Sequence, residues 1–124
     1  MKVHFDRDKI AAAVDKQLAA FAPHLEDAGN IGVQARMLTA AVKGIQLAIL
    51  DEFNRGTEIE DVIVGYASLV SNTMISFAES IAAGDRVEFF MFINEIYATI
   101  AECLSAKHLI GSVEKIPAEV VGHG

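Results

Sequence analysis

The stretch IVGYASLVSNTMISF, residues 63–77, carries no charged side chain, and the uncharged run around it is longer still. The run extends from Val62 to Ala78, seventeen residues between Asp61 and Glu79. Such a run could cross a membrane, line a ligand pocket or pack between other helices. The choice among these three decides the fold class of this chain of 124 residues.

Helical periodicity separates the apolar side chains of this run from the polar ones. At about 100° per residue, one arc of a helix collects Ile63, Tyr66, Val70, Met74, Phe77 and Ile81. The opposite arc collects Asp61, Gly65, Ser68, Asn72, Ser76 and Glu79. A spanning helix needs about 20 predominantly apolar residues, whereas this run is shorter, has a polar side and is flanked by charges. We therefore predict an amphipathic helix that does not enter a membrane.

The middle of the polar side is built only of small, neutral residues, which we call the neutral stripe: Gly65, Ser68, Asn72 and Ser76. A solvated helix face normally carries Lys, Glu or Arg. Small polar residues instead allow another helix to approach, because their hydroxyls can bond back to carbonyls of their own helix. We predict that the stripe contacts a helix of this or a second protomer. A serine-rich solvent face and a polar ligand site are the alternatives.

Start and stop signals divide the rest of the chain into helices. Asp6 can cap a first helix that Pro23 ends or bends, and a second helix is expected from about Ile31 to Arg55. In the second helix, the small residues Ala40, Gly44 and Ala48 would let another backbone approach closely.

Two capping boxes, TEIE from Thr57 and DRVE from Asp85, predict the starts of a third and a fourth helix. These helices are expected to end near Ala83 and Ile110. Glycines expected at or near helix C-termini are Gly29, Gly56, Gly84 and Gly111. Four helices with short connections predict an all-α, antiparallel bundle of four main helices. We expect one domain, residues 1–111, followed by an extended or disordered tail, residues 112–124.

The fourth predicted helix is apolar nearly all round. An acidic row, defined as Glu88, Glu95 and Glu102, repeats every seven residues on its outer side. Met91 and Phe92 flank this row, although one side of such a helix should face water in a monomer. We therefore predict a homodimer with Met91, Phe92 and the neutral stripe at its interface. Arg36 and Lys43, also seven apart, could pair with the acidic row across that interface.

The net charge of −7 arises entirely in the second half of the chain. Residues 1–56 carry seven basic and seven acidic residues, and residues 57–124 carry three and ten. This distribution disfavours nucleic-acid binding, which needs a basic surface, and would suit a basic protein partner. The single cysteine, Cys103, excludes an internal disulfide framework, and the charged first nine residues do not resemble a signal peptide. We expect a cytoplasmic protein.

We find no grouping of residues with a recognisable catalytic or metal-binding pattern. The histidines His4, His24, His108 and His123 are scattered, without Glu-x-x-His or His-x-x-x-His spacing. Cys103 is interpreted as a small apolar packing residue. No catalytic residue, metal or cofactor is therefore expected.

The leading hypothesis is a non-enzymatic, acidic, homo-oligomeric bundle that acts through protein–protein interaction, as an adaptor, chaperone-like protein or regulatory subunit. The alternative is a protein that binds a small apolar ligand between the third and fourth helices, in a pocket lined by Tyr66, Met74, Phe77, Phe90 and Tyr97. An enzyme with an unrecognised site is a third hypothesis.

Overall fold

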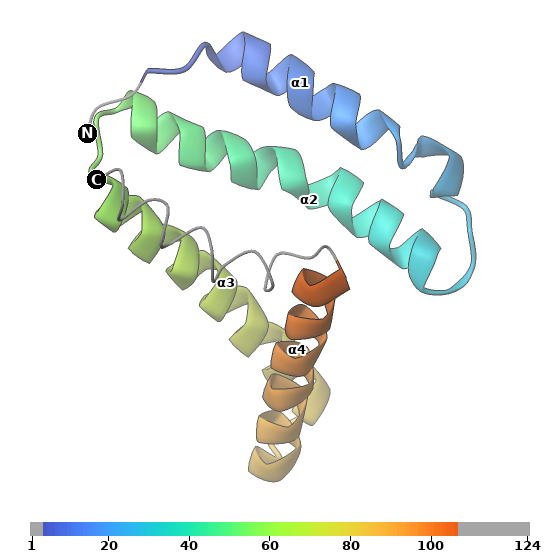
Figure 1. The fold of residues 1–124 in the computed structure, drawn as a ribbon. Helices are drawn as coiled ribbons and strands as arrows, with labels where there is room; N and C mark the ends of the chain where they lie inside the picture. The colour runs from blue at the N-terminus through green and yellow to red at the C-terminus, as the bar shows by residue number, and fades with distance from the viewer. Residues whose placement is uncertain (1–3, 107–124) are drawn as a thin grey trace. The chain divides into compact units, whose positions relative to one another are not determined.

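The structure is a computed structural model that describes residues 4–106. These residues form four main helices, α1 (Arg7–Ala19), α2 (Gly29–Asn54), α3 (Ile59–Ala82) and α4 (Arg86–Ala106), and one short 3₁₀ helix, η1 (Ala22–His24) (Figure 1). Within this described part there is no strand. The prediction of an all-α chain with four main helices is therefore confirmed. The predicted helix end near Ile110 and the predicted tail, residues 112–124, lie outside the described residues.

The chain divides into two compact units, Met1–Ser68 and Leu69–Gly124. The first unit holds α1, η1, α2 and the beginning of α3, and the second holds the remainder of α3 together with α4. The boundary therefore falls inside a continuous helix rather than in a linker. The expected single domain over residues 1–111 stays a prediction.

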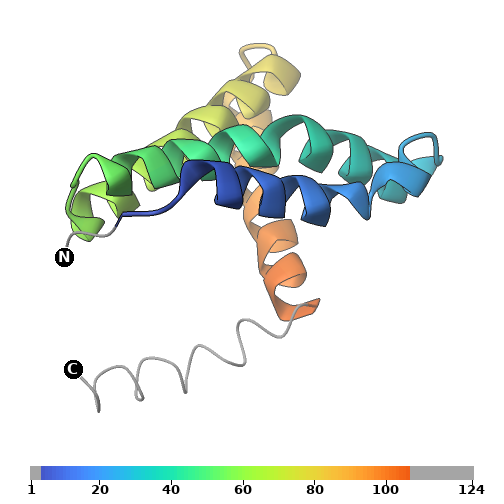
Figure 2. The ribbon, with the colours of Figure 1, turned by 90° about the horizontal axis from the view of Figure 1, so that it is seen from above.

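In the first unit, α1 runs antiparallel along α2 (Figures 1 and 2). Val14 of α1 and both Ala35 and Leu50 of α2 are buried. Asn54, at the end of α2, holds the segment before α1: its Oδ1 accepts from the Phe5 N–H at 2.6 Å, and its Nδ2 donates to the Phe5 carbonyl at 2.9 Å. The rings of Phe5 and Phe53 pack edge to face, with 6.1 Å between the ring centres.

The basic residues of α2 are engaged within this first unit. Lys43 Nζ lies 2.9 Å from an Asp15 carboxylate oxygen on α1. Arg36 Nη1 donates to the carbonyls of Leu25, at 2.8 Å, and Asp27, at 3.3 Å, in the connection between α1 and α2. Both side chains therefore already have acceptors within the first unit, and their pairing with the acidic row across an interface stays a prediction.

Two of the predicted helix caps are confirmed. The Asp6 carboxylate accepts from the N–H groups of Asp8, at 3.1 Å, and Lys9, at 3.2 Å. Asp85 accepts from the N–H of Glu88 at 3.0 Å. The third start is different, since α3 begins at Ile59, two residues after the predicted cap. The hydroxyl of Thr57 donates to the Glu52 carboxylate at 3.1 Å.

The expectation that glycines mark helix C-termini is correct at Gly56 and Gly84 and wrong at Gly29. Gly56 and Gly84, each two residues after the last residue of α2 and α3, have φ of 89° and 91°, as expected of residues that end a helix. Gly29 also has a positive φ, of 72°, but it begins α2, because α1 already ends at Ala19 and η1 with Pro23 follows. Gly44 has no described atom within 4 Å of the position that a Cβ would take. No described residue of this chain therefore approaches Gly44 closely, and approach by a second copy stays a prediction.

Candidate functional site

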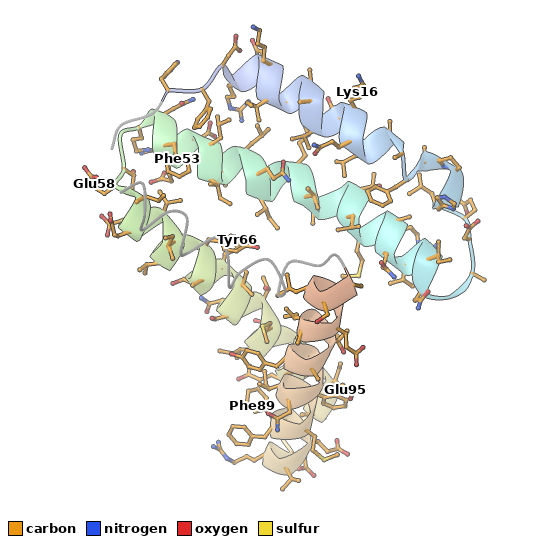
Figure 3. The ribbon with its side chains drawn as sticks, in the orientation of Figure 1. Lys16, Phe53, Glu58, Tyr66, Phe89 and Glu95 are labelled. Atoms are coloured by element: carbon orange, nitrogen blue, oxygen red, sulfur yellow. The ribbon has the colours of Figure 1, made fainter. Side chains whose placement is uncertain are left out.

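The helices α3 and α4 leave much of their apolar surface uncovered. The buried residues of α3 are the small or branched Val62, Ala78 and Ala82, and α4 has no buried residue. The large apolar side chains on α3 and α4 that are more than half exposed are Ile63, Val64, Phe77, Val87, Phe90, Met91 and Tyr97. Ile63 and Phe77 belong to the apolar arc that helical periodicity predicted for α3. Figure 3 shows how densely side chains line both helices.

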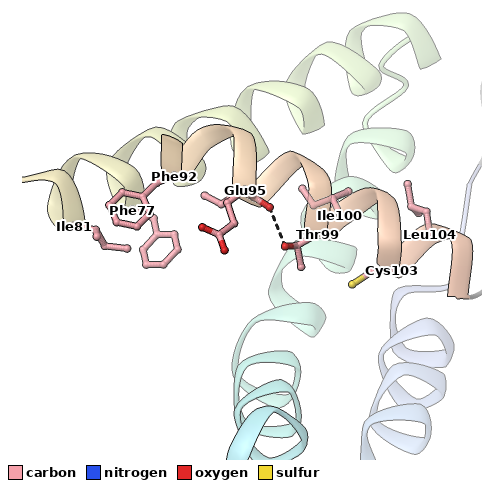
Figure 4. Close-up of a pocket in the computed structure, with 9 residues that line it drawn as sticks. Phe77, Ile81, Phe92, Glu95, Thr99, Ile100, Cys103 and Leu104 are labelled. Carbon is pink, nitrogen blue, oxygen red and sulfur yellow. Dashed lines mark hydrogen bonds between the residues drawn. The ribbon is translucent and has the colours of Figure 1, made fainter. Parts of the chain in front are cut away.

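The second unit contains an open hollow of about 460 Å³ between the end of α3 and α4, which we call the α3–α4 groove. Phe77 and Ile81 line it from α3. The residues that line it from α4 are Phe92, Glu95, Ile96, Thr99, Ile100, Cys103 and Leu104 (Figure 4). The groove is thus apolar along most of its length, with one carboxylate at its side.

Helical spacing explains why these side chains lie together. Phe77 and Ile81 are four apart on α3, and Phe92, Ile96 and Ile100 are four apart on α4, so each set shares a face. A tight turn joins the two helices through left-handed backbone at Ala83 (φ 50°) and Gly84 (φ 91°). The hairpin therefore brings two apolar faces toward one another.

The other polar side chain of the groove, Thr99, does not bond to the Glu95 carboxylate. The Thr99 hydroxyl donates to the Glu95 carbonyl at 2.8 Å, so its proton is used within α4 (Figure 4). No ion pair among the described residues involves Glu95 or the other two members of the acidic row. Residues 69–106 hold five acidic residues and one basic residue, Arg86. The Arg86 guanidinium lies over the Phe90 ring, 5.6 Å from its centre.

The structure distributes the predicted ligand-pocket residues over different places. Phe77 lines the α3–α4 groove. Met74, Phe90 and Tyr97 line a second hollow of the same unit, of about 260 Å³. Tyr66 lines neither of these two hollows. The sequence analysis missed Ile96 and Cys103 as groove residues, although their spacing from Phe92, four and eleven residues, was the available signal.

Of the predicted interface residues on α4, Met91 is 63% exposed and Phe92 is half-buried in the groove. The neutral stripe is exposed along its length. At Gly65, no described atom lies within 4 Å of the position of a Cβ. Back-bonding of hydroxyls occurs on α3 at neighbouring positions, from Thr73 to the Leu69 carbonyl and from Ser80 to the Ser76 carbonyl. Contact of the stripe with a second protomer stays a prediction.

Ser76→Arg tests whether the neutral stripe is exposed within a single chain. Because Ser76 is exposed, we expect the free energy of unfolding in urea to change by less than about 0.5 kcal/mol, as for other surface substitutions. Unfolding should be measured at the lowest workable protein concentration, so that the effect on folding of the single chain is separated from any effect on association. A loss of about 1–3 kcal/mol, the usual cost of overpacking, would contradict the exposed position.

The described residues contain no group of three or more His, Cys, Asp or Glu side chains that could hold a metal ion. The thiol of Cys103 is exposed in the groove, which corrects its interpretation as a packing residue. His24 Nδ1 lies 2.9 Å from an Asp27 carboxylate oxygen at the surface, as a local contact three residues apart. Neither residue belongs to a larger polar cluster in this part of the chain.

Both α3 and α4 are long and apolar enough to cross a membrane, judged by length and composition alone. The same test is passed by core helices of soluble proteins, which are mostly buried, whereas α3 and α4 are largely exposed. Glu95 and Asn94 stand near the middle of α4, and a charged side chain at the centre of a spanning helix costs about 2.5–3.5 kcal/mol on insertion scales. The sequence expectation of no membrane insertion stays a prediction.

The chain was compared with protein-family models, with curated proteins and with solved structures, and none of the three comparisons found a match.

Proposed function

We propose that this chain is a non-enzymatic, homo-oligomeric helical protein that acts by binding other macromolecules. The observation that carries the proposal is the apolar surface of α3 and α4, where residues such as Phe77, Met91 and Tyr97 remain more than half exposed. Soluble monomers rarely expose contiguous apolar patches of more than a few hundred Å². A second protein chain is the covering that uses this surface most directly.

The net negative charge of the second unit supports a basic protein as the partner. Residues 69–106 hold five acidic residues and one arginine, and Glu95 of the acidic row lines the apolar groove. Like charges placed opposite each other across an interface cost free energy, whereas opposite charges steer association. A lysine-bearing surface therefore fits this site better than an acidic one. A cytoplasmic location is part of the proposal.

The molar mass in solution tests the proposal. At micromolar concentration, light scattering is expected to report at least twice the chain mass of 13.3 kDa. Dilution should lower the mass reversibly, because the chain then loses its partner by mass action. A constant mass of one chain across this concentration range, with no bound ligand, would contradict the proposed self-association.

A small apolar ligand is the second candidate, and the volume of the groove favours it. Ligand pockets typically measure about 300–1,000 Å³ and are mostly apolar, a range that includes the groove at about 460 Å³. Native mass spectrometry distinguishes the two functions. A bound apolar compound on a single chain would support the ligand, and an unliganded dimer would support the interaction protein. Flotation with neutral lipid vesicles completes the test, since co-flotation would indicate association with a membrane instead.

A further inference from the structure

Helix α1, together with its C-cap residue Ala20, presents an exposed row that we call the lysine row: Lys9, Ala13, Lys16 and Ala20. These residues follow one another at intervals of four, three and four and therefore share one face. Val14, which is buried, lies on the other side of the helix, and Figure 3 shows Lys16 pointing away from α2. No ion pair among the described residues involves Lys9 or Lys16.

The two lysines of the lysine row have the same spacing as two members of the acidic row: Glu95, which lines the groove, and Glu102, which lies on the same side of α4. Lys9 and Lys16 are seven residues apart, as are Glu95 and Glu102 on α4. Seven residues of helix correspond to about 10.5 Å. The lengths agree as well, because α1 has 13 residues and the groove extends along α4 from Phe92 to Leu104, which is about 18–20 Å in each case.

We propose that the α3–α4 groove of one copy receives α1 of a second copy, with the lysine row paired against Glu95 and Glu102. The inference rests on the proposed homo-oligomer and names its contact. The small Ala13 and Ala20 let the backbone of α1 approach the large side chains of the groove. The methylene stems of the lysines cover apolar surface while their ammonium groups reach the carboxylates.

Charge identifies the lysine row as the matching surface. Every other lysine and arginine that the structure describes already has a partner within the chain. Arg36 and Lys43 have the partners given above. Arg7 pairs with Asp51 at 3.0 Å, Arg55 pairs with Glu52 at 3.3 Å, and the Arg86 guanidinium lies over the Phe90 ring. The acidic residues of α1, Asp8 and Asp15, lie about 100° round the helix from the lysine row. Asp15 is already neutralised by Lys43.

The contact forms twice in a twofold dimer, because each copy supplies one α1 and one groove. Two helix-in-groove contacts bring the buried area toward the roughly 1,200–2,000 Å² of a stable interface. Exposed ion pairs add only about 0–1 kcal/mol each. The groove therefore supplies affinity, and the lysines fix which helix enters and in which register.

Charge reversal gives the test. One variant chain carries Lys9→Glu and Lys16→Glu, and the other carries Glu95→Lys and Glu102→Lys. Each alone would place like charges at both contacts of its homodimer, so we expect at least a tenfold higher dissociation constant by sedimentation. In a mixture, both contacts become complementary, and the heterodimer should regain the wild-type mass. Glu79→Lys, an exposed change of α3 outside the α3–α4 groove, is the matched control and should leave the mass unchanged.

Cys103 supplies an independent readout because it is exposed in the groove. Its reaction with a maleimide should be at least tenfold slower in the wild-type dimer than in either single variant chain. A wild-type monomer would overturn the proposed self-association itself. A stable dimer insensitive to both charge reversals, with a reactive Cys103, would overturn only the α1 contact. Dissociation by the groove variant but not by the α1 variant would show that another segment occupies the groove.

Discussion

Gly32→Ala is expected to destabilise the first unit by about 3 kcal/mol, at the upper end of the range for overpacking. Gly32 is buried in the first turns of α2, where a Cβ would overlap the backbone carbonyl of Asp27. A backbone group cannot move aside as a flexible side chain can. The added methyl group would also press on Arg36 Nη1, which donates to the carbonyls of Leu25 and Asp27.

Gly44→Ala is the matched control in the same helix, and it should have the opposite sign. No described atom lies within 4 Å of a Cβ at Gly44, so only the helix propensity changes, which favours alanine by about 0.5–1 kcal/mol. Urea unfolding of the two variants and the wild type measures both effects. Equal shifts for the two variants would contradict the close approach at Gly32.

The local signals of the fold could be predicted from the sequence because they act over a few residues. Asp6 and Asp85 cap their helices through N–H groups two or three residues away. Gly29 was misassigned because a glycine with positive φ can precede a helix as well as follow one. Gly32 gave no signal, since its role depends on a carbonyl that approaches through the shape of the loop.

The candidate site was only partly predictable, because it depends on how neighbouring helices meet. Phe92 was singled out since it interrupts the polar side of an amphipathic helix. Its joint placement with Phe77 follows from the hairpin turn at Ala83 and Gly84. Arg36 and Lys43, which could pair with the acidic row across an interface, have closer acceptors in the first unit, and their sequence positions alone did not show this. Charge counting identified the acidic row, and only the structure showed which lysines have no partner in the described chain.

Phe92→Ala is expected to weaken the dimer by about 30-fold or more, the effect of losing an aromatic residue that contributes at least about 2 kcal/mol to an interface. Phe92 is half-buried on the wall of the groove, and the part of its ring that this chain leaves uncovered is available to a second copy. Sedimentation equilibrium gives the dissociation constant. Unfolding in urea at low protein concentration gives the separate cost to the single chain, about 2 kcal/mol if half of the usual loss for a buried phenylalanine applies.

Val87→Ala is the control on the same helix. Val87 is 70% exposed and lies about 140° round α4 from Phe92, away from the groove. Its truncation should change the dissociation constant by no more than about twofold, in line with small surface effects. Equal effects of the two substitutions would mean that the dimer does not use the groove. A selective effect of Phe92→Ala would show that the groove holds the second copy, because the two variants differ in which face of α4 they alter.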